Sequence, residues 1–177
     1  MYIERLTDKN HPLYKAAKEL YSISFPYREQ RENISQEKIL CDDEYCFGLV
    51  YDEAEFVGLA LYWETESFIY VEHLCISPEM RNRNYGSKVL NLLCEKHKTV
   101  ILEIDPPIDE ISIRRKGFYE RNGFEANPYN HVHPPYHTGV AGHDLVIMTY
   151  PKMITQIEYD NFDKYLKEHI MKDACGN

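Results

Sequence analysis

Two apolar runs separated by a helical segment constrain the fold of this chain more than any other feature. Residues 68–76 (FIYVEHLCI) have the pattern of a strand that Ser77 and Pro78 end, and residues 85–97 carry apolar side chains at helical spacing. Residues 99–104 (TVILEI) form a nearly continuous apolar run, which is typical of a strand buried on both faces. A strand, a helix and a second strand in this order predict two parallel neighbours joined by a right-handed crossover.

The segments around this crossover predict the rest of an α+β (mixed α/β) domain. Strand patterns occupy residues 2–6, 45–51, 56–63 and 144–150 and begin again at Phe124, and helical patterns occupy 12–22, 35–40, 109–122 and the region after 155. Gly123 is expected in the left-handed position that ends a helix, and Thr155 with Glu158 fits a capping box. We therefore expect one twisted, mostly antiparallel sheet with helices packed on it.

The length of 177 residues is that of one domain, so residues 1–177 are predicted to form a single unit. Its core is expected at about 1–150, and residues 151–177 are expected to add a C-terminal extension helix that covers the sheet or mediates a homodimer. The formal net charge is −9, from 29 acidic and 20 basic residues. This balance argues against nucleic-acid binding and suits a cationic, amine-bearing partner.

The five cysteines contain no Cys-x-x-Cys pair, which favours a reducing compartment over a disulfide framework. No apolar run approaches the roughly 18 residues of a membrane helix, and the first residues lack a signal-peptide core. These patterns predict a cytoplasmic protein with no membrane partner.

The turn that follows residues 68–76 is the strongest candidate binding site. It contains Arg81, Arg83 and Gly86 and opens a helix, whose first N–H groups and partial positive charge favour a phosphate ligand. Asn84 is the non-glycine residue type that best tolerates a left-handed conformation. The residues alone leave two alternatives, an anion-binding turn and an ordinary solvated turn.

The same turn resembles the acetyl-CoA signature of the GNAT N-acetyltransferases, a strand followed by [QR]-x-x-G-x-[GA]. Arg81 fills its first position and Gly86 its last, while Asn84 stands where the pattern has glycine. The segment before and after the turn also fits, because Ile76 precedes Ser-Pro and a helix continues from Lys88.

Residues 112–124 (SIRRKGFYERNGF) resemble the later helix of that family, N-x-x-A-x-x-x-Y-x-x-x-G-F. Tyr119, Gly123 and Phe124 match this pattern, whereas Ser112 and Arg115 replace its asparagine and alanine. The resemblance covers about residues 45–150, and the helix after Thr155 lies outside the common core.

The resemblance implies the GNAT acyl-CoA N-acyltransferase fold, with acetyl-CoA as cosubstrate between two splayed parallel strands, 68–76 and 99–104. The strand backbone would pair with the pantetheine arm, and the turn would hold the pyrophosphate. The cofactor-binding residues that the resemblance implies are Leu74, Cys75, Ile76, Arg81, Asn82, Arg83, Asn84, Tyr85, Gly86, Ser87, Ser112 and Phe118.

Acetyl transfer to an amine requires a neutral nucleophile, a stabilised oxyanion and a proton for the departing thiolate. Tyr119 matches the general acid of the family, and the alternative is a tyrosine that only anchors its helix. Strict alternation along residues 68–76 places Tyr70, Glu72, Leu74 and Ile76 on one face and Ile69, Val71, His73 and Cys75 on the other. Glu72 is therefore the predicted base, and Tyr70 is a predicted substrate contact.

Other residues give alternative interpretations of the chemistry. Glu103 on the neighbouring strand competes with Glu72 as the base, and His133 is a third candidate. Cys75 is expected to be a small buried hydrophobe rather than a nucleophile. Gly117, inside a predicted helix, suggests either a close approach by cofactor or sheet or a tolerated surface glycine.

The segment 127–143 (NPYNHVHPPYHTGVAGH) contains four histidines without a recognised ligand spacing, so no metal site is predicted. It is expected to form a wall or lid of the acceptor pocket, or else a rigid surface loop. Tyr129, His133 and Tyr136 are its predicted substrate contacts.

The sequence therefore predicts an enzyme that transfers an acetyl group from acetyl-CoA to a primary amine of a small, cationic molecule by direct attack. An acceptor amine on a protein is one alternative. Another is a non-catalytic acyl-CoA sensor, favoured by Asn84, Ser112 and Arg115, and a third is an unrelated nucleotide-phosphate binder.

Overall fold

A computed structural model describes residues 1–175 of the protein. Its strands lie where the alternating and apolar runs of the sequence predict them. The predicted bounds of the strands that begin at residues 2, 45, 56, 68, 99 and 144 are confirmed to within one residue. The strands are β1 (Tyr2–Leu6), β2 (Tyr45–Asp52), β3 (Glu55–Glu64), β4 (Phe68–Ile76), β5 (Thr99–Ile104), β6 (Glu125–Ala126), β7 (His131–His133) and β8 (His143–Tyr150).

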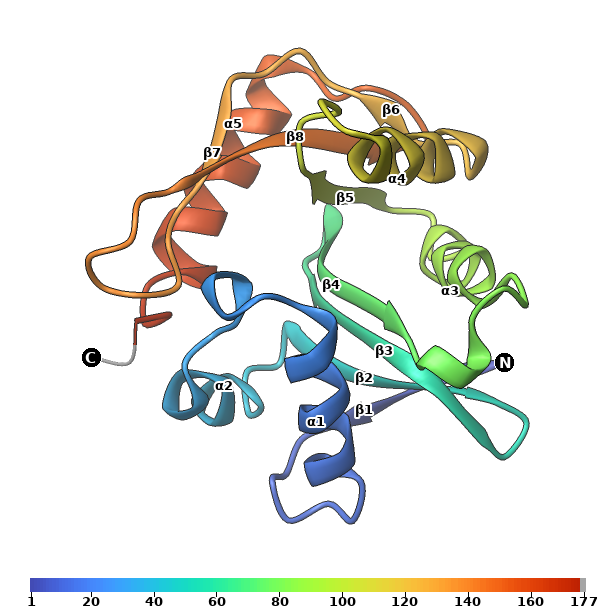
Figure 1. The fold of residues 1–177 in the computed structure, drawn as a ribbon. Coiled ribbons are helices and arrows are strands. Elements are labelled where there is room, and N and C mark those ends of the chain that lie inside the picture. The colour runs from blue at the N-terminus through green and yellow to red at the C-terminus, as the bar shows by residue number, and fades with distance from the viewer. Residues whose placement is uncertain (176–177) are drawn as a thin grey trace. The chain divides into compact units, whose positions relative to one another are not determined.

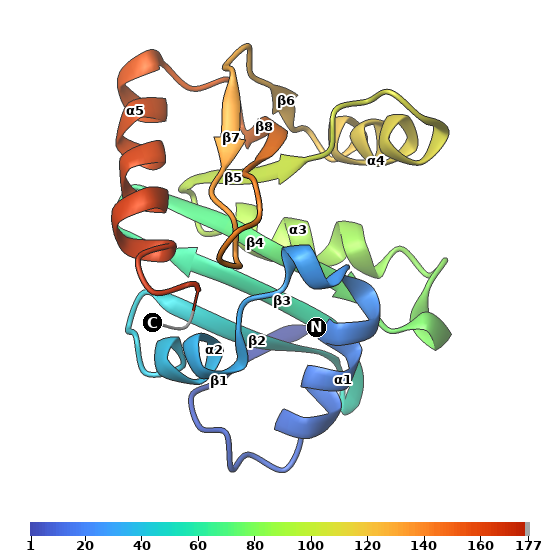
Figure 2. The same ribbon diagram turned by 60° about the vertical axis from the view of Figure 1, so that its left-hand side comes forward.

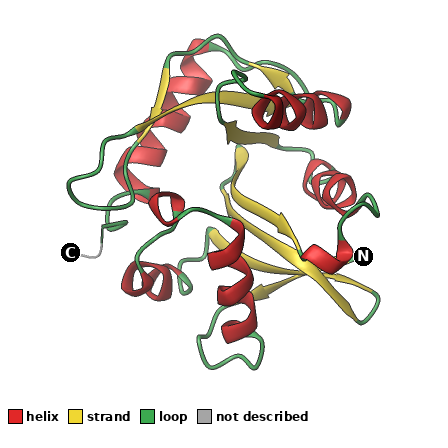
Figure 3. Ribbon diagram, in the orientation of Figure 1, coloured by secondary structure: helices red, strands yellow, loops and turns green. Residues whose placement is uncertain are grey.

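Within residues 1–175, five α-helices separate or follow these strands, and Figure 3 distinguishes the two kinds of element. They are α1 (Tyr14–Ser24), α2 (Asn33–Ile39), α3 (Tyr85–Cys94), α4 (Glu110–Arg121) and α5 (Gln156–Tyr165). The predicted helix over 85–97 is three residues too long, because the backbone at His97 is left-handed. None of the helices among residues 1–175 is both long and apolar enough to cross a membrane.

The chain divides into two compact units. Unit 1 contains Met1–Pro26 and Glu37–Ile101, and unit 2 contains Tyr27–Gln36 and the chain from Leu102 onward. The prediction of a single domain stays a prediction, and residues 176 and 177 of the predicted extension lie outside the described residues.

Unit 1 is built on an antiparallel run of strands in the order β1-β2-β3-β4, and β5 is the parallel neighbour of β4. Figures 1 and 2 show α1 and α3 on opposite faces of this sheet. The core between them is rich in fully buried aromatic residues, each of which contributes roughly 1.5–3 kcal/mol of burial free energy. They include Tyr21, Tyr45, Phe47, Trp63 and Tyr70.

An extra residue in β4 changes which side chains share a face. His73 pairs with Leu61 and Val71 pairs with the next residue, Tyr62, so Glu72 is unpaired and forms a β-bulge. The bulge puts Val71 and His73 on opposite faces. The predicted strict alternation along this strand is therefore wrong, because one additional residue resets the two-residue period.

In unit 2, β6 and β7 both pair antiparallel with β8, β6 near the end of that strand and β7 at its start. In the strand order β8 lies between β5 and β6. The predicted strand from Phe124 is reduced to two residues, and β7 lies in the segment 127–143, for which no strand was predicted. Helix α5 begins at the predicted capping box of Thr155 and Glu158. It buries Phe162, and a single π-helical turn then buries Leu166 and Ile170.

Candidate functional site

The turn between β4 and α3, residues 81–87, has two left-handed residues. Asn82 and Asn84 each have φ of 62°. Asparagine adopts this conformation more readily than other non-glycine residues, so the predicted tolerance of Asn84 is confirmed and its difference from the family glycine is accommodated.

The backbone N–H groups of this turn have no partners in the part of the chain that the structure describes. None of the six amides from Asn82 to Ser87 donates a hydrogen bond, and the first bonded amide of the helix is that of Lys88, which donates to the Asn84 carbonyl. Unpaired amides beside a helix N-terminus are donors that suit an oxyanion.

Two arginines of the turn lie against their own loop. The Arg81 Nε donates to the Ile76 carbonyl at 3.3 Å, and the Arg83 Nη1 lies 3.8 Å from the Met80 sulfur. Both side chains are exposed. Residues 77–88 carry three basic side chains, Arg81, Arg83 and Lys88, against one acidic side chain, Glu79, so the turn is locally basic in an acidic chain. The Lys88 Nζ lies 3.9 Å from Asp52 Oδ2.

The first turn of α3 is anchored to β2 by a hydrogen bond. The Tyr85 hydroxyl donates to Asp52 Oδ2 at 2.9 Å, and the Tyr85 residue is 8% exposed. This hydrogen bond raises the pKa of Tyr85. The hydrogen bond between Tyr85 and Asp52 fixes the start of α3 on β2. The unpaired N–H groups of the turn therefore have a defined position.

The end of β4 carries the residues predicted to line the cofactor and the acceptor. Leu74 and Ile76 are half-buried, and Cys75 is buried. Burial raises the pKa of the Cys75 thiol, which agrees with a packing residue rather than a nucleophile. At the bulge, the Trp63 indole Nε1 donates to Glu72 Oε2 at 2.9 Å, which orients the half-buried carboxylate.

Helix α4 begins with a capping box that the sequence analysis missed. The Asp109 carboxylate accepts from the amides of Ile111 and Ser112 at 2.8 and 2.9 Å. The Ser112 hydroxyl accepts from the Asp109 amide and lies 3.1 Å from the Asp109 carbonyl. Because this hydroxyl serves the helix start, its predicted contact with the pantetheine arm stays a prediction.

Tyr119 lies in the last turn of α4. Its ring contacts Phe118 and Phe124 edge to face, with centroids 5.2 and 5.9 Å away. The half-buried side chain makes no hydrogen bond through its hydroxyl to any of residues 1–175. Burial raises the pKa of Tyr119, so the phenol is protonated at neutral pH and can donate.

Gly117 has nothing close to it within unit 2 except Arg121. An added Cβ would meet the Arg121 Nη1 at 3.2 Å. A close approach by the sheet is therefore excluded within this unit, and the two interpretations that stay open are a close approach by the cofactor and a tolerated surface glycine.

The predicted substrate contacts in 127–143 have partners of their own. Tyr129 donates to the Ile154 carbonyl at 2.7 Å and stacks on Tyr159. His133 and Tyr136 are buried and stacked, with ring centroids 5.0 Å apart. In unit 1, the fourth predicted contact, Tyr70, is also buried.

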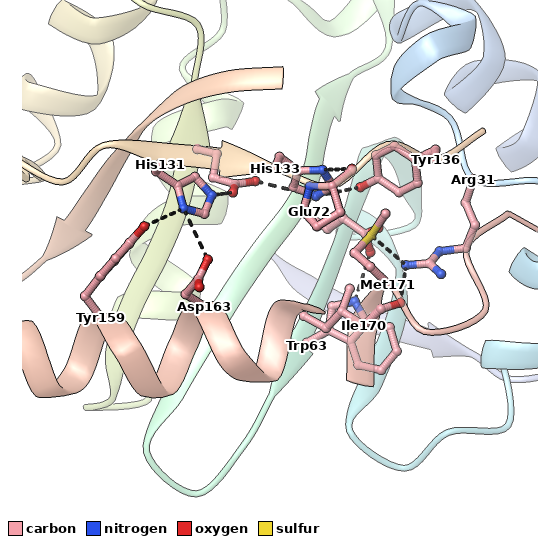
Figure 4. Close-up of polar contacts among 12 residues, drawn as sticks. Arg31, Trp63, Glu72, His131, His133, Tyr136, Tyr159, Asp163, Ile170 and Met171 are labelled. Carbon is pink, nitrogen blue, oxygen red and sulfur yellow. Dashed lines mark hydrogen bonds and ion pairs between the residues drawn. The ribbon is translucent and has the colours of Figure 1, made fainter. Parts of the chain in front are cut away.

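Histidine His131, which the sequence analysis did not single out, lies at the centre of a buried polar network (Figure 4). Its Nε2 contacts the Glu103 carboxylate, and its Nδ1 lies 3.1 Å from the Tyr159 hydroxyl and 3.8 Å from Asp163. The only sequence signal was the spacing His-x-His, which puts two imidazoles on one face of a strand.

The comparisons with known proteins decide the family. The model of the "Acetyltransferase (GNAT) family" matches residues 11–124, more than half of the chain. This chain belongs to the GNAT acetyltransferase family. A solved structure of a GNAT-family protein from Bacteroides thetaiotaomicron is 27% identical and has a TM-score of 0.90, over 97% of this chain and 98% of that one.

Two Bacillus subtilis proteins are also similar to this GNAT chain, one in sequence and one in fold. YjbC, named as a candidate acetyltransferase, is 29% identical over 104 residues, which is 57% of this chain and 52% of YjbC. The match thus spans about half the length of that curated relative. An acetyltransferase solved in complex with CoA is 14% identical with a TM-score of 0.58, over 85% of this chain and 98% of that one, and shows the fold alone.

Proposed function

We propose that this protein is an acetyl-CoA-dependent N-acetyltransferase that acetylates a primary amine of a small, cationic molecule by direct attack. The observation that carries the proposal is the run of six unpaired amides from Asn82 to Ser87, placed at the family's cofactor motif. Family membership gives the reaction class, and the turn gives the means of holding the cosubstrate.

The open amides and the charge of the turn suit the diphosphate of CoA. Asn82 and Asn84 are left-handed, the six amides from Asn82 to Ser87 have no partner in residues 1–175, and Arg81 and Arg83 add positive charge. The exposed guanidinium of Arg81 can bind a phosphate oxygen while its Nε keeps the Ile76 carbonyl. Leu74, Cys75 and Ile76 offer the backbone along which the pantetheine arm is proposed to lie. When bound, acetyl-CoA supplies an activated acyl group and a thiolate leaving group.

Tyr119 is proposed as the general acid. Burial keeps its phenol protonated, and its hydroxyl is not committed to another group in residues 1–175. The neighbouring Phe118 and Phe124 fix the ring, which limits the entropy lost when the hydroxyl meets the sulfur. Its role is to give a proton to the thiolate as the carbon–sulfur bond breaks.

Glu72 is proposed as the base that neutralises the incoming ammonium group, directly or through water. The bulge takes it out of the β3 ladder, and the Trp63 indole orients its carboxylate through the hydrogen bond of 2.9 Å. A carboxylate also attracts a cationic acceptor. The net charge of −9 acts in the same direction at longer range.

Calorimetric titration with CoA, followed by a screen of amines with free-thiol detection, tests the proposal. We expect saturable CoA binding and release of thiol with at least one small polyamine or amino-sugar acceptor, confirmed by a product that is 42 mass units heavier than the amine, about one acetyl group. Binding of CoA without transfer to any amine or peptide would contradict the enzyme and favour the sensor.

A peptide amine and a small amine are separated in the same screen. Peptides with a free N-terminus or a lysine serve as the competing acceptors. A kcat/KM for a peptide above that for every small amine would overturn the proposed substrate class while leaving the acetyl-CoA-dependent activity in place.

A further inference from the structure

The proposed acid, Tyr119, becomes a phenolate when it gives its proton to the thiolate, and this inference therefore rests on the proposed function. Burial raises the pKa of Tyr119. It keeps the proton on the phenol before the reaction, but it also makes the loss of that proton unfavourable, because a phenolate in apolar surroundings is poorly solvated. A positive charge close to the ring would offset this cost.

Two cationic residues of α4, Arg115 and Lys116, lie one helical turn before Tyr119. Arg115 is four positions away, so its Cβ lies roughly 5–6 Å from that of Tyr119 on the same face of the helix. Helical side chains lean toward the N-terminus, which directs the Tyr119 ring over the turn that carries Arg115. Lys116 is accompanied by an acid, since its Nζ lies 3.2 Å from Glu120 Oε1.

The guanidinium of Arg115 is held by an ion pair on the other side of its turn. Its Nη1 lies 2.7 Å from Asp105 Oδ2, and the second carboxylate oxygen of Asp105 lies 3.3 Å from His143 Nε2. With this carboxylate in place, the charge of Arg115 still opposes the effect of burial and lowers the pKa of Tyr119. The ion pair therefore fixes the guanidinium without cancelling its charge at the phenol.

Position 115 is one where this chain departs from the family pattern N-x-x-A-x-x-x-Y. Alanine at this position carries no charge, so the cation beside the tyrosine is a property of this chain rather than of the pattern. The departure favours a non-catalytic sensor only if the arginine has no part in the reaction. Its place one turn from the proposed acid gives it such a part.

The geometry points to Arg115 as a positioning residue for the acid: its charge, held in place by Asp105, stabilises the Tyr119 phenolate as it forms. When the carbon–sulfur bond breaks, the electron pair stays on sulfur, and the thiolate takes the phenolic proton. The negative charge then lies on the phenolate oxygen, within reach of the guanidinium. The phenolate regains a proton from solvent, and the amine nitrogen releases its protons to solvent.

A titration of the acid tests this assignment without requiring activity. Trifluorotyrosine in place of Tyr119 has a phenol that ionises closer to neutral pH, and its ¹⁹F shift reports the ionised fraction. Arg115→Met should raise the midpoint by about 0.5 pH unit, a moderate effect because the Arg115 side chain is 48% exposed and its charge is screened. Arg115→Lys should restore most of the difference. Lys116→Met is the matched control and should leave the midpoint unchanged.

Asp105→Asn separates the charge of the pair from its shape. This variant removes the partner of the guanidinium but keeps the cation, so the ¹⁹F midpoint should not rise. A rise equal to that in Arg115→Met would show that the ion pair acts on the tyrosine through structure alone and would overturn the assignment.

Steady-state kinetics connect the charge to the reaction. With the best amine from the screen, Arg115→Met should lower kcat about 5-fold and change the KM for acetyl-CoA less than about 2-fold, because the lost interaction is made as the acid ionises. In the Tyr119→Phe background, Arg115→Met should cause no further loss, since no phenolate forms. Lys116→Met should keep the wild-type kcat.

Two further results would overturn this assignment while leaving the proposed function intact. One is an unchanged midpoint and kcat in folded Arg115→Met, and the other is an equal loss of kcat with and without the Tyr119 hydroxyl. If Arg115→Met fails to fold, Arg115→Ala, which puts the family residue at this position, takes its place. A wild-type protein that transfers no acetyl group would remove the proposed function and the catalytic role of Arg115 with it, whereas the ¹⁹F midpoint would still measure the action of Arg115 on Tyr119.

Discussion

The turn of residues 81–87 and the segment 127–143 are built in opposite ways. In the turn, six consecutive amides are unpaired and the arginines are exposed, so its polar groups are available to a ligand. In the segment, His131, His133 and His137 are buried, and their rings contact Glu103, the Pro134 carbonyl and Glu32 respectively. A site made from backbone can be kept through changes of side chain, whereas a site made from side chains changes with each of them.

The largest effect should come from Tyr119→Phe. This variant changes neither of the two regions and removes the proton that the proposed acid donates. We expect kcat to fall about 100-fold while the Kd for CoA is nearly unchanged, because the ring and its contacts with Phe118 and Phe124 remain. Steady-state kinetics and calorimetry measure the two quantities. Wild-type turnover at saturating substrates would remove the role of this residue as the acid.

A substitution at Asn84 tests whether the turn depends on backbone conformation. Asn84→Val should weaken CoA binding about 10-fold, since a β-branched residue at φ of 62° is strained by roughly 1–2 kcal/mol. Asn84→Gly is the matched control and should bind at least as well as the wild type. Equal affinities for the two variants would show that the left-handed conformation is not needed.

Arg81→Ala tests the contribution of side-chain charge to the same turn. The Kd for CoA should rise about 10-fold, which corresponds to one charge-assisted hydrogen bond, and the loss should shrink at high salt. Arg114→Ala, which removes an exposed arginine of α4, is the control and should leave the Kd unchanged. An equal loss in both variants would indicate general attraction rather than a contact in the turn.

Thr155→Ala tests the stability of the fold at a residue that lies outside both the turn 81–87 and the segment 127–143. The Thr155 side chain caps α5 by accepting from the Glu158 amide, so its loss should cost about 1 kcal/mol and lower the thermal midpoint by roughly 2–4 °C. Differential scanning calorimetry measures the shift, and kcat should not change. A kinetic defect in this variant would instead connect the C-terminal helix to the reaction.

The smallest expected effect is that of alkaline pH on the acid. Because burial raises the Tyr119 pKa above its ordinary value of 10.0, the phenol keeps its proton as the pH rises from 8 to about 10. The kcat of the wild type should therefore show no fall in that interval. A fall that is absent from Tyr119→Phe would contradict a raised pKa.

Helix ends and turns could be predicted from the sequence, because their conformation depends on residues that are adjacent in the chain. Gly123 has φ of 84°, and the Thr155 capping box is present, because both depend on residues adjacent in the chain. The turn at Asn84 was predictable for the same reason. The functional roles of Tyr119 and Glu72 came from the resemblance and from strand position, and they stay predictions.

Features that depend on distant partners could not be predicted. The contact of Glu103 with His131 joins residues 28 positions apart, and Arg115, at a position where the family has alanine, is bound to Asp105. The Asp109–Ser112 box was missed although it is local, because Ser112 was considered only as a ligand contact. The bulge in β4 was missed because an alternating pattern contains no mark of an unpaired residue.

That bulge makes position 72 the place where the length of β4 can change without a change of pairing. Glu72→Gln preserves the number of residues between Val71 and His73, so both halves of the strand keep their present partners on β3. Deleting Glu72 would make Val71 and His73 adjacent, and because these two already lie on opposite faces, the ladder would close with every other residue still opposite its present partner. Chimaeras with relatives that are joined within this strand should therefore be aligned on the unpaired residue, not on the strand ends.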